Sequence, residues 1–297
     1  MNKLLILKYI VLINLFLFGC ISDSNNDKSI EDKINGDSSI DDEYMKKAKF
    51  IFYSMSSPIE MAGIFHNAGA IYEPEILNPT INAENYSTSY KAALNLGIYG
   101  VDLSYTRMFD QLQESINYLA AIKQLADVLG VPEEYVSFTA ENIEKSIKDK
   151  DSLMLIATNA YSSTDIYLKS GERENSAALI ILGGWIEALY VALNIFDEKT
   201  PDRIIMERIA EQKYSLNSLI ALLSNFSNDL QISEYILMLK KLKKVYDTFE
   251  IYFEQGDVDI DTVNQVISLN RNRIDVSVEQ ILEIKSIIKS IRAKIIE

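Results

Sequence analysis

The chain has 297 residues, and its 29 Lys and Arg against 43 Asp and Glu give a formal net charge of −14. So acidic a chain is poorly suited to nucleic acid, because neutralising phosphates requires clustered Lys and Arg. Its only cysteine, Cys20, excludes a disulfide within one chain and a cysteine-based metal site.

The first residues carry a charged start followed by a short apolar run that ends at Gly19 and Cys20. A secretory signal has this order of parts, with a small residue before the cleavage point. A transmembrane helix is the alternative, but it needs about 20 uninterrupted apolar residues. Lys8 and Asn14 interrupt the run here. We therefore predict that residues 1–19 are a signal peptide and that Cys20 begins the mature protein.

The sequence Leu17-Phe18-Gly19-Cys20 resembles the lipobox of bacterial lipoproteins. That pattern has an aliphatic residue three positions before the cut, a small residue just before it, and a cysteine that takes diacylglycerol. The resemblance implies membrane attachment through lipid on Cys20, where more than one acyl chain gives stable anchoring. In some Gram-negative bacteria an aspartate after the cysteine retains lipoproteins at the inner membrane. Ile21 stands there instead, so the outer membrane is preferred over the inner.

Residues 20–43 are rich in Ser, Asn, Asp and Lys and poor in large apolar side chains. Such a segment buries too little apolar surface to offset the entropy lost on ordering. We interpret it as the lipidated cysteine followed by a flexible acidic tether. The remaining residues, 44–297, are numerous enough for one large domain.

Apolar residues in this domain recur at helical spacing, while Pro and Gly are scarce. Near the end of the chain one stripe follows steps of three and four: Ile281, Ile284, Ile288, Ile291 and Ile295. Such a stripe marks one buried face of a helix. Strand alternation is hard to find, so the sequence predicts an all-α, multi-helix antiparallel bundle.

Caps and breakers divide the domain into predicted helices separated by short connections. In chain order they are Pro58–Ala68, Ser87–Phe109, Asp110–Leu129 (separate from the previous one or continuous with it), Glu133–Phe138, Glu141–Lys148, Ser152–Lys169, Ser176–Ile195, Asp202–Asn225, Ser233–Phe253, Asp261–Asn270 and Ser277–Ile296. The segment Tyr72–Asn85, with Pro74 and Pro79, is the longest non-helical piece predicted within the domain.

The chain matches itself once, without a gap. Ala92-Ala93-Leu94, followed by Asp102 and Tyr105, recurs at a constant offset as Ala177-Ala178-Leu179, Glu187 and Tyr190. Glycines lie inside both segments, and glycine within a helix costs about 1 kcal/mol relative to alanine. Their presence indicates close backbone approach. We infer an internal pseudo-twofold repeat of two helices that cross near their glycines.

Each of these helices carries a carboxylate with a tyrosine one turn later, on the same face. One interpretation is a polar ligand pocket at the crossing, lined by Tyr99, Asp102, Tyr105, Trp185, Glu187 and Tyr190. Another is structural: each buried carboxylate is satisfied by its tyrosine or by Arg107, since an unpaired buried charge is costly. Chance similarity of two Ala- and Leu-rich helices is the third.

No motif for a metal or a cofactor is present in the sequence. Di-metal bundles use a Glu-x-x-His spacing, and tyrosine occupies the histidine position here. The chain has one histidine, His66, and neither phosphate-binding glycine loops nor a Gly-x-Ser-x-Gly elbow. The basic clusters Lys240–Lys244 and Lys285–Lys294 are interpreted as solvated helix faces. We expect no metal and no cofactor.

The segments Ala93–Leu103 and Gly183–Tyr190 resemble those of uncharacterised all-helical envelope lipoproteins of Gram-negative bacteria. That resemblance implies an address in the cell envelope and no particular activity. The first hypothesis is a membrane-anchored envelope lipoprotein whose helical domain binds an unknown protein or small molecule. An enzyme using Asp102 and Glu187 as an acid/base pair is the alternative. A purely structural or assembly role is also open.

Overall fold

The computed structural model of the chain describes residues 69–132, 164, 166–168, 171, 173–252, 258–261, 266–269 and 273–297. All of them belong to one unit, Tyr44–Glu297. Several predictions lie outside the described residues, namely the signal peptide, Cys20, the tether, and the helices Pro58–Ala68, Glu133–Phe138 and Glu141–Lys148, with most of Ser152–Lys169. The predicted all-α class is confirmed, because the described residues are predominantly helical.

Two short 3-10 helices, η2 (Pro74–Ile76) and η3 (Thr80–Asn85), occupy the segment that was predicted to be non-helical. The long helices follow the predicted ones within a few residues at most ends. They are α4 (Ser89–Met108), α5 (Leu112–Val128), α8 (Glu174–Ile195), α9 (Arg203–Ser224), α10 (Leu230–Tyr246) and α11 (Val278–Ile296).

Side-chain caps explain where several of these helices begin. The Asp229 carboxylate accepts hydrogen bonds from the next turn, so α10 begins at Leu230 rather than at the predicted Ser233. Ser277 and Gln280 form a reciprocal capping box at the start of α11. Between α4 and α5, Asp110 has a left-handed φ of 59°, so these two helices are separate rather than continuous.

The predicted helix Asp261–Asn270 is wrong. Strands β2 (Val258–Asp261) and β3 (Val266–Leu269) pair antiparallel in this part of the chain, and β1 (Ile251–Tyr252) pairs with β4 (Arg273–Ile274). The β2 and β3 sequences are rich in Val and Ile, whose branched side chains favour extended backbone. The strand β1 also lies where α10 was predicted to continue to Phe253.

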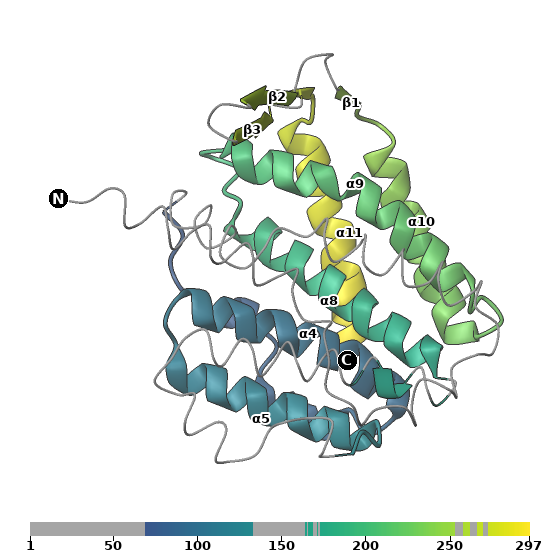
Figure 1. Cartoon of the computed structure of the whole chain (residues 1–297). Helices are drawn as coiled ribbons and strands as arrows, with labels where there is room; N and C mark the ends of the chain where they lie inside the picture. The colour runs from purple at the N-terminus through teal and green to yellow at the C-terminus, as the bar shows by residue number, and fades with distance from the viewer. Residues whose placement is uncertain are drawn as a thin grey trace. The chain divides into compact units, whose positions relative to one another are not determined.

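The α4 and α8 helices lie side by side and form the most extensive helix contact in the described part (Figure 1). A Cβ atom on Gly97 would lie 2.6 Å from the backbone nitrogen of Gly184 and would overlap the carbonyl oxygen of Ile180. A Cβ on Gly183 would overlap the carbonyl oxygen of Leu94. The two backbones therefore touch at the glycines, and the predicted close crossing is confirmed.

These two helices run parallel, because Leu94 and Gly97 lie against Gly183 and Gly184, and Asp102 lies near Glu187 further along both helices. Helices joined by short loops, α4 with α5 and α9 with α10, run antiparallel, as the predicted bundle requires. A long intervening segment separates α4 from α8 in sequence, so no short loop forces them to reverse direction.

The core surrounds α8. By length and composition this helix is apolar enough to cross a membrane. However, 83% of its apolar 18-residue stretch is buried inside the structure, as in the core helix of a soluble protein. The α11 helix packs against α8 and α10 (Figure 1). The five isoleucines of its predicted stripe are at most 2% exposed.

Candidate functional site

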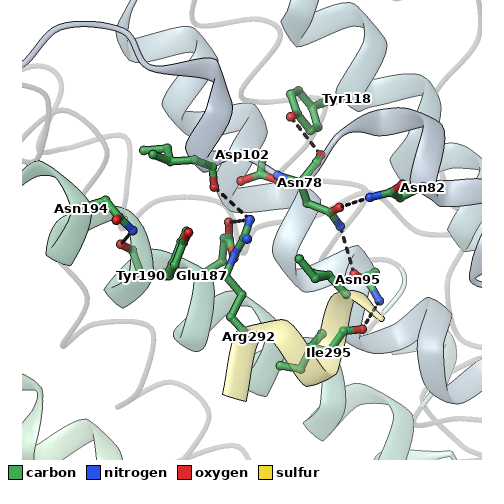
Figure 2. Close-up of polar contacts among 12 residues, drawn as sticks. Asn78, Asn82, Asn95, Asp102, Tyr118, Glu187, Tyr190, Asn194, Arg292 and Ile295 are labelled. Atoms are coloured by element: carbon green, nitrogen blue, oxygen red, sulfur yellow. Dashed lines mark hydrogen bonds and ion pairs between the residues drawn. The ribbon is translucent and has the colours of Figure 1, made fainter. Parts of the chain in front are cut away.

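Asp102 on α4 and Glu187 on α8 occupy equivalent places in the repeat, and neither has any exposed surface. The close contact at Gly97 and Gly183 brings the two helix faces together. Asp102 and Glu187 lie on these faces, just over one helical turn after the glycines. Apart from burial, the negative charge of Glu187 is the main cause that raises the pKa of Asp102. The two side chains lie near one another within the core, and Figure 2 shows them with their neighbours.

Arg292 on α11 is the cation that pairs with this site. Its Nε and Nη2 atoms donate to the two carboxylate oxygens of Glu187 at 2.5 and 2.7 Å, a bidentate geometry. The Nη2 atom also donates to the carbonyl oxygen of Ile76 at 3.0 Å. The ring of Tyr190 lies 4.1 Å from the guanidinium carbon, a cation–π contact. Arg292 thus joins α11 to α8 and to η2.

The environment of Asp102 favours its protonated form. Its Oδ2 accepts a hydrogen bond from the backbone nitrogen of Asn78 at 3.1 Å, whereas its buried Oδ1 has no hydrogen-bond partner. Burial holds the pKa of Asp102 well above its ordinary value, and the negative charge of Glu187 raises it further against the opposing charge of Arg292. A protonated Asp102 can use its hydroxyl as a donor toward Glu187.

Glu187 is the ionised member of the pair. Burial raises its pKa as well, but its hydrogen bonds to Arg292 and the positive charge there oppose this shift. Burial likewise opposes the charge of Arg292, although pairing with Glu187 leaves the pKa of Arg292 above its ordinary value. One protonated carboxyl, one carboxylate and one guanidinium make a buried cluster without net charge. We call Asp102, Glu187 and Arg292 the carboxyl–arginine cluster.

Asn78 connects this cluster to the surrounding elements through both its backbone and its side chain. Besides the bond to Asp102, its carbonyl oxygen accepts from the Tyr118 hydroxyl on α5 at 3.0 Å. Its side-chain amide donates to Tyr86 at 3.1 Å and to Asn95 at 3.2 Å. Asn78 is fully buried, and burial without hydrogen bonds would be costly. The residue therefore acts as a junction (Figure 2).

The same network reaches the last turn of α11. The Asn95 amide donates to the carbonyl oxygen of Ile295 and the Tyr86 hydroxyl to that of Ile296, each at 3.1 Å. Carbonyls in the last turn of a helix have no partner within the helix. Side chains from α4 and from the end of η3 therefore complete α11.

The other members of the predicted pocket bond elsewhere. The Tyr99 hydroxyl donates to the carbonyl oxygen of Pro79 at 3.0 Å. The Tyr105 hydroxyl accepts from the backbone nitrogen of Glu73 at 3.1 Å and donates to the carbonyl oxygen of Ile71. Trp185 donates from its indole to the Ser215 hydroxyl at 2.9 Å. The structure therefore brings together Asp102, Glu187 and Tyr190, and it directs Tyr99, Tyr105 and Trp185 to separate partners.

Sequence reasoning missed Arg292, Asn78 and Asn95. Arg292 fell within the cluster Lys285–Lys294 that was predicted to be a solvated face; for Arg292 that prediction is wrong, since it is 6% exposed. It lies four residues after Ile288 and three before Ile295, so its place on the buried stripe was a usable signal. The lysines 240, 241 and 244 are exposed, as predicted for the other basic cluster.

The arrangement suits structural pairing better than catalysis. A general acid or base must come within hydrogen-bond reach of its substrate. Asp102 and Glu187 are fully buried, and Glu187 already has both oxygens engaged by Arg292. Within the described part of the chain, no group of three or more His, Cys, Asp and Glu side chains could hold a metal ion.

Comparison with protein-family models, with curated proteins and with solved structures finds no match for this chain.

Proposed function

We propose that the protein is a lipid-anchored component of the cell envelope, with the outer membrane preferred over the inner. Its helical domain serves as a non-catalytic binding or interaction module for a protein or a small molecule. The lipobox-like segment before Cys20 and the acidic tether after it support the address. The net charge of −14 makes nucleic acid an unsuitable partner.

The observation that carries the non-catalytic assignment is the closed carboxyl–arginine cluster. Asp102 and Glu187 are the carboxylates that an acid/base enzyme would use, and both are sealed in the core at 0% exposure. Their partners come from α11 and from the segment between η2 and η3, so the cluster fixes helices in place. This supports a scaffold whose outer surface meets the partner.

The address is tested by growing cells with a labelled fatty acid and recovering the protein. We expect label on the wild type and none on Cys20→Ser, because Cys20 is the only cysteine. Ser22→Ala, which keeps the cysteine, is the matched control and should be labelled normally. An intact Met1 terminus with an unmodified thiol in the native protein would sink the proposal.

Membrane choice is tested with Ile21→Asp. Placing an aspartate directly after Cys20 should move the protein from the outer-membrane to the inner-membrane fraction. Ile21→Ser alters the same position without the charge and should stay with the wild type. Recovery of the wild type in the inner membrane would contradict the preference for the outer one.

The non-catalytic role is tested by comparing what co-purifies with the wild type and with Asp102→Asn. Since the Asp102 side chain is buried, the amide should leave the recovered partners and their amounts unchanged. Loss of a small molecule or of a turnover activity specifically in the amide variant, with unchanged folding, would instead favour the enzyme alternative.

A further inference from the structure

Residues 71–86, which we call the strap, cover the carboxyl–arginine cluster without forming a long helix or a sheet. They contain η2 and η3, two 3-10 helices separated by Leu77, Asn78 and Pro79. The strap is buried at its centre, where Leu77 is 4% and Asn78 0% exposed. At its sides it exposes Ile71 and Ile81, at 70% and 68%. The strap therefore separates the cluster from solvent by a single layer of chain, with Leu77 and Asn78 facing inward.

Side chains from three helices hold the strap in place. Tyr105 and Tyr99 on α4 bond its backbone at Glu73 and at Pro79, and Tyr118 on α5 bonds the carbonyl of Asn78. Between these points the strap bonds directly to the cluster. The carbonyl oxygen of Ile76 accepts from Arg292 at 3.0 Å, and the backbone nitrogen of Asn78 donates to Asp102 at 3.1 Å.

The charge count of the cluster requires one bound proton. Two carboxyl groups and one guanidinium are buried together, and two ionised carboxylates would leave an uncompensated negative charge in a dry site. Such a buried, unpaired charge is strongly unfavourable. The Oδ1 atom of Asp102, which has no partner as an acceptor, is suitably placed to be the protonated oxygen.

We propose that Asp102, Glu187 and Arg292 form a proton-dependent latch: the strap stays closed while the carboxyl pair holds one proton and opens when that proton is lost. Losing the proton creates a second buried carboxylate, which needs water. The α4 and α8 backbones are in close contact at Gly97 and Gly183, which leaves no room for water between them there. The α11 helix is fixed by its buried isoleucines. The strap is therefore the element that can move to admit water.

The other ionisable groups around Asp102 do not lose or gain a proton in the pH range in which the carboxyl pair loses its proton. The titratable and charged groups that face it are Glu187 from α8, Arg292 from α11, Tyr118 from α5, Tyr99 from α4, and Tyr72 and Tyr86 from the strap. Burial raises the pKa of Tyr72 to about 12 and raises the pKa of the other three tyrosines as well. These tyrosines remain neutral, so the carboxyl pair is the titrating element.

Amide hydrogen exchange of the purified full-length protein in detergent, measured against pH, tests the latch. After correction for the intrinsic rate of exchange, protection of the strap amides, that of Asn78 above all, should fall as pH rises. For opening linked to one proton, the fall is about tenfold per pH unit between the pKa values of the open and closed states. Wild-type protection that is independent of pH would overturn the proposal.

Two variants separate the proton from general loosening. Asp102→Asn keeps an acceptor for the Asn78 amide and a donor toward Glu187, so its strap should stay protected at every pH. Tyr118→Phe removes an uncharged attachment of the same strap; it should lower protection by a constant factor and keep the wild-type pH slope. Equal slopes in wild type and Asp102→Asn would overturn the assignment to this carboxyl pair.

An infrared measurement keeps the proposal testable if a variant folds poorly. Wild-type protein at neutral pH should show the C=O stretch of a protonated, buried carboxylic acid, and alkali should remove it together with strap protection. Absence of this band from the folded wild type at neutral pH would overturn the proposal without reference to any variant.

Discussion

Asp102 and Glu187 lie near one another on two parallel helices, and a single arginine from α11 pairs with the Glu187 carboxylate. The repeat that relates them also supplies the glycines that let α4 and α8 touch. Backbone contact and polar pairing are therefore two results of one duplicated pattern. Each can be tested separately, because the glycines and the carboxyl groups occupy different turns.

Replacing Asp102 by asparagine should stabilise the protein at neutral pH and less so in acid. The pKa of Asp102 is raised by folding, so the stability this group contributes is full below its ordinary value and is lost as pH rises through the raised one. The difference amounts to about 1.4 kcal/mol for each unit of pKa shift. Urea unfolding at several pH values measures it. An amide variant that is less stable than wild type at neutral pH would contradict the assigned protonation.

Removing the Arg292 charge should be strongly destabilising. Arg292→Met leaves Glu187 buried without its cation, a change that costs about 3–5 kcal/mol in comparable buried pairs. Lys289→Met is the matched control, because Lys289 is exposed on the same helix and its loss should change the free energy of unfolding by less than about 0.5 kcal/mol. Equal effects of the two substitutions, measured by chemical denaturation, would show that the ion pair is not a stabilising contact.

Three of the helical glycines, Gly97, Gly183 and Gly184, should respond differently to alanine. Gly97→Ala and Gly183→Ala place a methyl group onto the backbone of the facing helix, and such overpacking costs about 1–3 kcal/mol or more. At Gly184 the added Cβ would lie 3.5 Å from the carbonyl oxygen of Gly97, an ordinary contact, so helix propensity favours alanine by about 1 kcal/mol. Thermal melting of the three variants should therefore order Gly184→Ala highest. A uniform response would refute the close backbone contact.

Loss of the Asn78 side chain should destabilise the protein, because Asn78 joins several hydrogen-bonding partners in the core. Asn78→Ala leaves the Asn95 Oδ1 acceptor without the donor it has in the structure, and one such buried orphan costs about 1–3 kcal/mol. Asn217→Ala removes an exposed asparagine that bonds within its own helix and should have little effect. If the two variants melt at the same temperature, Asn78 is not a stabilising junction.

The long helices and the repeat could be predicted because both follow from the local spacing of apolar and small residues along the chain. The Ala-Ala-Leu pattern, the glycines and the isoleucine stripe each report a buried face without any knowledge of the partner. The partner of Glu187 could not be predicted in this way. Arg292 lies among lysines that are less buried than it is, and only its spacing from Ile288 and Ile295 separates it from them. The partners of Tyr99 and Tyr105 could not be predicted, because a hydroxyl at the end of a long ring reaches beyond its own helix, to backbone such as Pro79.

The position of Arg292 in the last helix has a consequence for how this domain is made. Asp102 and Glu187 leave the ribosome well before Arg292. Glu187 therefore has no cationic partner in the centre of the bundle until α11 docks. Until then Asn95 and Tyr86 also lack the carbonyls of Ile295 and Ile296 that they later bind. Completion of the interior is therefore a late event in biogenesis, and a precursor halted upstream of this helix retains a core that water can still enter.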